Sequence, residues 1–279
     1  MATVGVVTDS TADLPPGLVE RYGIGLVPLV VNWDNQTFRD KIDLSTAEFY
    51  RRLRLSKSLP KTGAPSLAAF EAVYREQLAQ HDAVVCINLA ARLSGTNDVA
   101  QRAAEAVERE RISVIDSGSV SIALGFLVEA AAKMAQHGDG QATIVERIEE
   151  MKARLRVFAV LETLEFLQRG GRIGRARALA GTLLNVKPIL RVHDGEVEPV
   201  ERVRTMNGAL RRVVELVVGL GPVERVGVMD GDATANAVQV EQQLRGQFPD
   251  LTIDRGELGP VVGTHAGPGV VGIGLLLAS

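Results

Sequence analysis

The chain has 279 residues, of which 46% are hydrophobic and 28 are glycine, a composition typical of a folded α/β protein and unlike that of a disordered chain. Its 31 basic and 34 acidic residues leave a formal net charge of −3, so bulk charge gives no reason to expect nucleic acid or an anionic membrane as a partner. The length is large for one compact core, and we therefore predict two domains.

The start of the sequence and its apolar runs indicate a soluble cytoplasmic protein. The first ten residues lack the basic region and long apolar core of a signal peptide. The longest apolar stretches are interrupted by charges well before they reach the length of a membrane span, so no insertion into a membrane is expected. The single cysteine, Cys86, lies inside an apolar run and is predicted to be a buried small hydrophobe in a reducing compartment.

The first half of the chain alternates short β-branched runs with helical patterns, which is typical of a parallel sheet with crossover helices. Ser45 and Glu48 form a capping box that predicts the start of one helix, and Ser66 predicts the start of the next. The segment 121–138 is apolar on nearly all sides and ends in glycine, which predicts a buried helix. Strands are predicted at 3–8, 24–31, 83–89 and 112–116.

After residue 155 the pattern changes. A turn at 193–196 is followed by an alternating apolar and polar segment, which predicts a hairpin and hence antiparallel pairing. Helices at 206–219 and 234–246, a strand at 225–231 and a last apolar segment complete this half. The predicted fold class is therefore α/β with two domains. Residues 1–155 would form an α/β/α domain with a mainly parallel sheet, and 156–279 an α/β domain with a mixed or antiparallel sheet.

Small hydroxyl side chains follow several of the predicted strands. They occur at Ser10 and Thr11, at 94–96 and at 117–119, and Thr62 lies in a loop punctuated by proline and glycine. Each cluster taken alone is explained as a helix N-cap. Because the carboxyl ends of parallel strands meet at one edge of a sheet, the clusters together predict an anion-binding site at that edge.

Several other kinds of site are disfavoured. Gly267, Gly269 and Gly272 match a dinucleotide fingerprint, but only seven residues follow Gly272 and no βαβ unit fits there, so these glycines are predicted to allow close packing or close approach of a ligand. Four scattered histidines and one cysteine give no metal-ligand spacing. Asp9 and Asp13 are predicted to have turn or cap roles. We therefore predict no catalytic residue, no metal and no cofactor.

Arginines gather around a glycine-rich turn in the second half. Four lie between Arg169 and Arg177, and Arg202 and Arg204 follow on a predicted strand. A solvated helix end explains most of them. If a few meet at one opening, they would form a docking surface for an acidic partner or a phosphate.

Several short motifs occur in the chain in this order: VTDSTADL, PKTGAPS, RLSGT, IDSGSVS, LQRGGRIG, KPIL, VRT and HAGPGVVGIG. Taken together, these motifs resemble those of the DegV family of bacterial fatty-acid-binding proteins, over residues 4–276. The resemblance implies two α/β domains with a long-chain fatty acid held between them. It also implies that the protein is not itself catalytic but is the carrier subunit of a fatty acid kinase, whose separate ATP-binding subunit makes the acyl phosphate.

By position, the resemblance implies that Thr62 and Ser94 bind the carboxylate of the fatty acid. It places Arg172, Arg204 and His265 around the opening that faces the kinase. Two segments differ from the usual family pattern. Gly63 and Ala64 follow Thr62 where the family usually has serine and glutamine, and Leu89-Ala90-Ala91 stands where it usually has a pair of serines before the LSGT element.

Two other functions remain open at this stage. One is a stand-alone enzyme that acts on a small phosphorylated or carboxylated metabolite, with Asp9 or His265 as acid or base. The other is a lipid sensor that signals through protein contacts without any transfer reaction. The first requires turnover without a partner, and the second requires that no acyl phosphate form when a kinase subunit is added.

Overall fold

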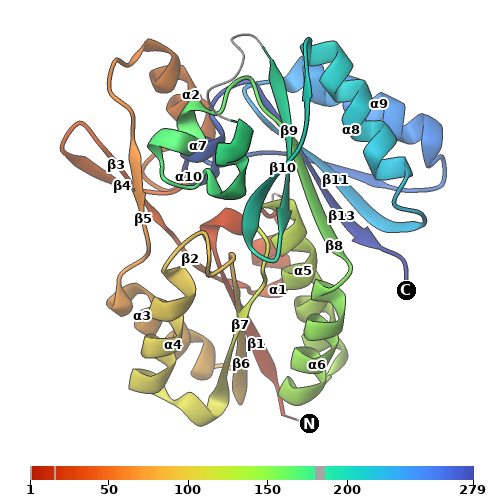
Figure 1. Cartoon of the computed structure of the whole chain (residues 1–279). Coiled ribbons are helices and arrows are strands. Elements are labelled where there is room, and N and C mark those ends of the chain that lie inside the picture. The colour runs from red at the N-terminus through yellow and green to blue at the C-terminus, as the bar shows by residue number, and fades with distance from the viewer. Residues whose placement is uncertain (1, 16, 180–185) are drawn as a thin grey trace.

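The computed structural model describes residues 2–15, 17–179 and 186–279. Its lower half in Figure 1 is built on a parallel sheet with helices on both faces. Helices α3 (Leu67–Leu78) and α4 (Thr96–Val107) pack on one face, and α5 (Ile122–His137) and α6 (Gln141–Lys152) on the other. The strands, in sheet order, are β2 (Gly25–Val27), β1 (Val4–Asp9), β6 (Ala83–Asn88) and β7 (Ile112–Asp116).

The upper half contains a six-stranded mixed sheet (Figure 1). Helices α8 (Met206–Val218) and α9 (Thr234–Gln247) cover its outer face. Strands β11 and β12 pair in parallel and the other neighbours are antiparallel, so the prediction of a mixed sheet is confirmed. In sheet order the strands are β10 (Glu196–Val203), β9 (Lys187–His193), β8 (Leu155–Val160), β13 (Val270–Leu277), β11 (Val223–Gly231) and β12 (Ile253–Glu257).

A small antiparallel sheet corrects one sequence prediction. The segment 24–31 was predicted as one strand, but β2 ends at Val27 and a separate strand, β3 (Val30–Trp33), joins a different sheet. Pro28 lies between them; proline has no N–H to donate to a ladder, so the run is interrupted there. In this sheet β3 pairs with β4 (Gln36–Arg39) and with β5 (Lys61–Gly63), which carries Thr62.

Local signals for helix ends are confirmed. Ser45 accepts a hydrogen bond from the Glu48 N–H at the start of α2 (Thr46–Leu55), and Ser66 caps α3 in the same way. Gly138 ends α5 in the left-handed conformation. The remaining helices are short: α1 (Leu18–Tyr22), α7 (Glu165–Arg169), α10 (Pro260–Ala266) and the 3-10 helices η1 (Ser10–Ala12), η2 (Arg109–Arg111) and η3 (Gly174–Leu179).

The first half of helix α5 is buried on all sides because it lies between the two large sheets. Its first seven residues, 122–128, are all buried. It contacts β1 and β6 of the parallel sheet and β8, β11 and β13 of the mixed sheet. The strands of the parallel sheet all precede residue 117, and those of the mixed sheet begin at residue 155. The division into two domains at residue 155 stays a prediction. None of the helices in the described ranges has the length and apolarity that a membrane span requires.

Candidate functional site

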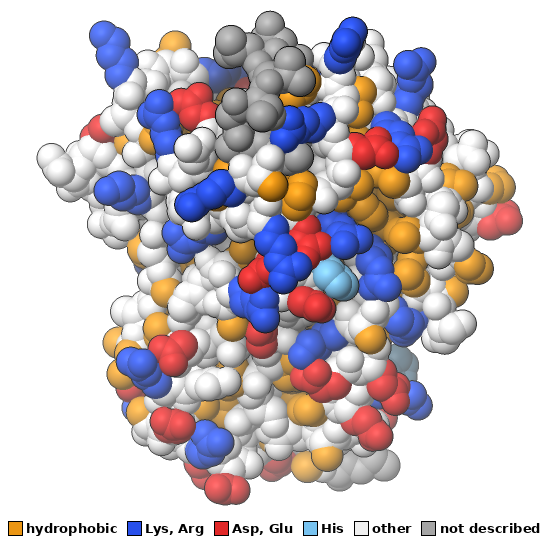
Figure 2. Space-filling view, in the orientation of Figure 1, with side chains coloured by type: hydrophobic (Ala, Val, Ile, Leu, Met, Phe, Trp, Pro, Cys, Tyr) orange, Lys and Arg blue, Asp and Glu red, His pale blue; other side chains and the backbone are white. Residues whose placement is uncertain are grey.

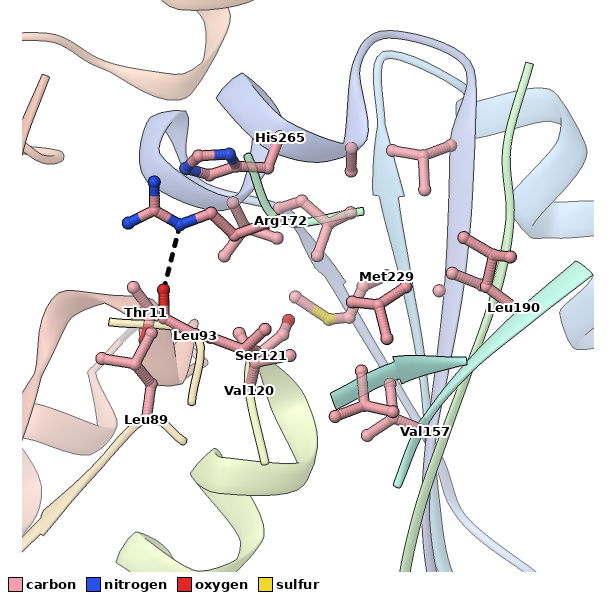
Figure 3. A pocket seen from close by; sticks show the side chains of 18 of the residues that line it. Thr11, Leu89, Leu93, Val120, Ser121, Val157, Arg172, Leu190, Met229 and His265 are labelled. Carbon is pink, nitrogen blue, oxygen red and sulfur yellow. Dashed lines mark hydrogen bonds between the residues drawn. The ribbon is translucent and has the colours of Figure 1, made fainter. Parts of the chain in front are cut away.

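A largely apolar cavity lies between the inner face of the mixed sheet, the start of α5 and helix α10 (Figure 3). The centre of a water molecule can occupy about 140 Å³ of this cavity. The empty space between the lining atoms, including the open mouth, is about 1020 Å³. Most lining residues are aliphatic, and the polar ones are Thr11, Thr62, Ser94, Ser121, Arg172, Arg191 and His265.

Thr62 and His265 meet at one end of this cavity. The Thr62 hydroxyl lies 2.8 Å from Nε2 of His265, which joins β5 to α10. The imidazole packs so closely on Gly170 that a β-carbon there would overlap the ring. The glycine of the arginine-rich turn therefore leaves space for His265.

Arg172 connects this pair to the loop that carries Ser94. Its Nε donates to the carbonyl of Leu93 at 3.0 Å (Figure 3), and its Nη1 donates to the carbonyl of Gly170 at 2.9 Å. Ser94 Oγ lies 2.9 Å from the hydroxyl of Thr96 and accepts from the Thr96 N–H at 3.3 Å. The residues Thr62, Ser94, Arg172 and His265 thus line the same apolar cavity.

His265 is neutral at physiological pH. Burial, with a smaller contribution from the positive charge of Arg172, lowers the pKa of His265 to about 4. A neutral imidazole has one N–H donor and one acceptor nitrogen. With the proton on Nε2, His265 donates to Thr62, and the Thr62 hydroxyl proton is left to donate to an anion in the cavity.

A second, more polar cavity opens beside this end. The centre of a water molecule can occupy about 360 Å³ of this second cavity. The two cavities share Thr62, Arg172 and His265. Lys61 and Arg169 also line it, and none of its described lining residues is acidic. Carboxylate or phosphate groups are attracted to such an opening.

A buried ion pair fixes the start of α10. Lys41 Nζ lies 2.5 Å from Asp13, whose carboxylate also accepts from the Ser121 hydroxyl at 2.7 Å and from the Gly259 N–H at 3.1 Å. Asp9 fits its predicted cap role, since it accepts from the Thr11 N–H at 2.9 Å. Asp13 does more than end a turn, because it ties the end of η1 to the loop before α10.

Ion pairs hold the β9–β10 hairpin over one side of the apolar cavity. Glu196 pairs with Arg92 and Arg175, and Glu198 with Arg175 and Arg191. Figure 2 shows these basic and acidic side chains crowded over the hairpin in the middle of this face. The hairpin contributes Val192 and Val197 to the lining, which the sequence pattern did not reveal.

Other predicted site residues lie apart from this group. The hydroxyl of Ser10 accepts from the Leu29 N–H, and Ser117 donates to the carbonyl of Ser119, so these hydroxyls are used inside the fold. Arg204 is exposed at the end of β10 and is not among the residues that line either cavity. Its role stays a prediction. Within the described residues, no group of three or more metal-ligating side chains comes together.

Comparisons with known proteins show the family to which this chain belongs. A family model described as an uncharacterised protein of the DegV family matches residues 3–278. The chain belongs to the DegV family. A DegV domain-containing protein of Caldanaerobacter subterraneus is 36% identical over 276 residues and covers 98% of both chains. The DegV protein of Bacillus subtilis is 33% identical over 274 residues, 97% of this chain and 98% of the relative.

Solved structures of DegV proteins superpose closely on this one. A DegV family protein from Thermus thermophilus, described by its fatty acid binding, has a TM-score of 0.93 at 31% identity and covers 99% of this chain and all of its own. DegV of Bacillus subtilis, described as a fatty acid binding protein, has a TM-score of 0.91 at 32% identity with 100% of both chains covered. The B3 protein of Streptococcus pneumoniae fatty acid kinase, described as loaded with linoleic acid, has the same fold, with a TM-score of 0.88 at 20% identity over 99% of this chain and 100% of its own.

Proposed function

We propose that this protein binds a long-chain fatty acid, with the acyl chain in the apolar cavity and the carboxylate at Thr62 and Ser94. One observation carries the proposal: a largely aliphatic cavity is lined by the hydroxyls of Thr62 and Ser94 together with a neutral histidine and an arginine. The fatty acids described for two DegV proteins of known structure support the same ligand class. The acyl chain would lie between residues 1–155 and 156–279, which we propose as two domains.

In this proposal the chain and the head group have different roles. A chain of about 16 carbons, at roughly 0.8 kcal/mol per buried CH₂, contributes on the order of 12 kcal/mol before the costs of ordering and association. Hydrogen bonds to a charged group contribute about 1.5–3 kcal/mol each. The acyl chain therefore supplies most of the affinity, and the hydroxyl pair fixes the position of the carboxylate.

We further propose that the carboxylate is presented through the second cavity to a separate kinase subunit, which forms the acyl phosphate. The choice of a kinase follows from the family resemblance. The geometry supports an approach on this side, because Thr62, Arg172 and His265 line both cavities and the outer one carries further cationic side chains. Phosphoryl transfer depends on the position of the attacking carboxylate and on stabilisation of the negative charge of the phosphoryl group. In this proposal Thr62 would hold the carboxylate, and the cationic side chains of the opening would stabilise the charge.

Organic extraction of the purified protein, followed by mass spectrometry, tests the ligand. We expect a long-chain fatty acid at near one molecule per chain. Recovery of no lipid, together with no uptake of added fatty acid, would refute the carrier function. ATP-dependent formation of acyl phosphate upon addition of a fatty acid kinase subunit then separates a carrier from a lipid sensor.

A further inference from the structure

Four residues form a row across the inner face of the mixed sheet. Gly272 on β13 pairs with Ala159 on β8 and with Met229 on β11, and Ala159 pairs in turn with Leu190 on β9. All four line the apolar cavity. The two residues in the middle of the row are the smallest, so the row forms a trough between the side chains of Leu190 and Met229.

The space beside Gly272 is part of the apolar cavity and is not filled by other side chains. Strand β13 lies inside the sheet, hydrogen-bonded on both sides, yet Gly272 is partly exposed, while Val271 and Ile273 on either side of it are buried. A β-carbon at this position would have no heavy atom nearer than 3.9 Å, where it would meet Met229 and the carbonyl of Phe158. Its backbone is outside the region that favours glycine. Neither packing nor backbone geometry therefore requires glycine here.

The neighbouring glycines of the sheet differ in this respect. A β-carbon on Gly274 would overlap Ile122 of α5, and one on Gly227 would come within 2.6 Å of the same side chain. Those two glycines are needed for helix α5 to pack on the sheet. Gly272 and Gly274 both line the cavity, but only Gly274 has a helix side chain against it.

We propose that Gly272 determines which acyl chains the cavity accepts, by letting the chain lie directly against the backbone of β13. The row of Gly272 lies about 7 Å along the strand from Val270 and as far again from Gly274. Chain atoms that pass Gly272 can reach the space lined by Val157 and its strand neighbour Val192. Figure 3 shows Val157 at the end of the cavity away from His265. This inference rests on the proposed fatty acid binding.

A side chain at position 272 would narrow the cavity at that row. Because protein interiors are close-packed, the added carbons and an acyl chain cannot both occupy the trough without displacing their neighbours. Chains short enough to end before the row are unaffected, and longer chains lose affinity. The selection is therefore by length, and it is independent of the carboxylate site.

The test compares Gly272→Ala and Gly272→Val with the unchanged protein. Each is offered an equimolar mixture of saturated fatty acids from dodecanoic to octadecanoic acid, and the bound acids are extracted and quantified by mass spectrometry. We expect the valine variant to bind octadecanoic acid about tenfold more weakly relative to dodecanoic acid, and the alanine variant to fall between. Gly246→Ala, at an exposed position with no atom near its β-carbon, is the matched control and keeps the original profile.

The outcomes separate this inference from the proposed function. If the unchanged protein binds fatty acids and both Gly272 variants keep its length profile, the inference is overturned and fatty acid binding stands. Equal weakening of all chain lengths would also overturn it, because a length filter cannot act on chains that end before the row. If the unchanged protein binds no fatty acid, both proposals fail.

Discussion

Thr62 and His265 are 203 residues apart in the sequence, and their side chains meet at 2.8 Å between β5 and α10. The contact joins a hydroxyl from the first half of the chain to an imidazole from the second. Burial and the charge of Arg172 hold that imidazole neutral. The site therefore exists only when the two halves are packed together, and the following predictions test its parts.

Removing the hydroxyls of Thr62 and Ser94 is expected to affect the position of the carboxylate more than the affinity for the fatty acid. In Thr62→Ala with Ser94→Ala, acyl phosphate formation by an added kinase subunit should be lost, because the carboxylate is no longer held in place. Much of the fatty acid binding should remain, because the acyl chain supplies most of the affinity. Calorimetric binding and the kinase assay on the same preparation measure the two quantities. Complete loss of binding in a folded variant would contradict this division of roles.

Gly170→Ala is expected to displace His265, since its β-carbon would overlap the ring. The backbone of Gly170 has φ −76°, which alanine adopts without strain. Once the ring moves outward it is better hydrated, so its pKa should rise from about 4 toward 6.5. An NMR titration of the histidine ring signals measures this. Gly140→Ala, with the same φ of −76° and open space around its β-carbon, should leave the His265 pKa unchanged.

The free energy of unfolding should change with pH in the way expected for a buried neutral histidine. The folded-state pKa of His265 is about 4, against 6.5 for the free side chain, so the unfolded chain binds more protons between these pH values. His265 therefore lowers the unfolding free energy as pH falls from 6.5 to 4, by about 3 kcal/mol.

Urea unfolding of the protein and of His265→Gln at several pH values measures that difference. Burial raises the pKa of Asp40 to about 6, which has the opposite effect, since stability from this group is present at low pH and lost as pH rises through 6. Asp40 is common to both proteins, so their difference isolates His265. A gap between the two stability curves that does not change over pH 4 to 6.5 would contradict the assignment.

Asp13→Asn is expected to destabilise the fold by about 3–5 kcal/mol, because it leaves Lys41 without its buried carboxylate partner. The same change weakens the bond to Gly259 that fixes the start of α10. Glu105→Gln breaks an exposed pair with Arg109 and should alter stability by less than about 1 kcal/mol. Thermal unfolding of the two variants gives the comparison, and equal shifts would show that the Asp13 pair is no more important than a surface pair.

Features that depend on neighbours in the sequence could be predicted well. The capping serines, the glycine stop of α5 and the antiparallel hairpin all follow from local backbone chemistry. The run 24–31 was wrongly predicted as one strand because a hydrophobic pattern carries no information about which sheet a strand joins. Pro28 was the local signal for that division.

The site was predictable only in part. The DegV resemblance directed attention to Thr62, Ser94, Arg172 and His265, and the structure brings these four into the lining of one cavity. The roles of Asp13 and Gly272 depend on long-range packing. Asp13 contacts Gly259 across 246 positions. Gly272 faces a cavity whose walls come from six strands of two sheets and from helices and loops. No periodicity in one segment reports such contacts.

The most direct test of the central claim is an NMR spectrum of a long-chain fatty acid, labelled at its carboxyl carbon, bound to the delipidated protein. We predict one resonance from the bound acid, which stays ionised to lower pH than the free acid because hydroxyl donors and Arg172 favour the carboxylate. That resonance should shift in Thr62→Ala and in Ser94→Ala. No bound resonance, or a bound resonance that neither substitution moves, would contradict the account.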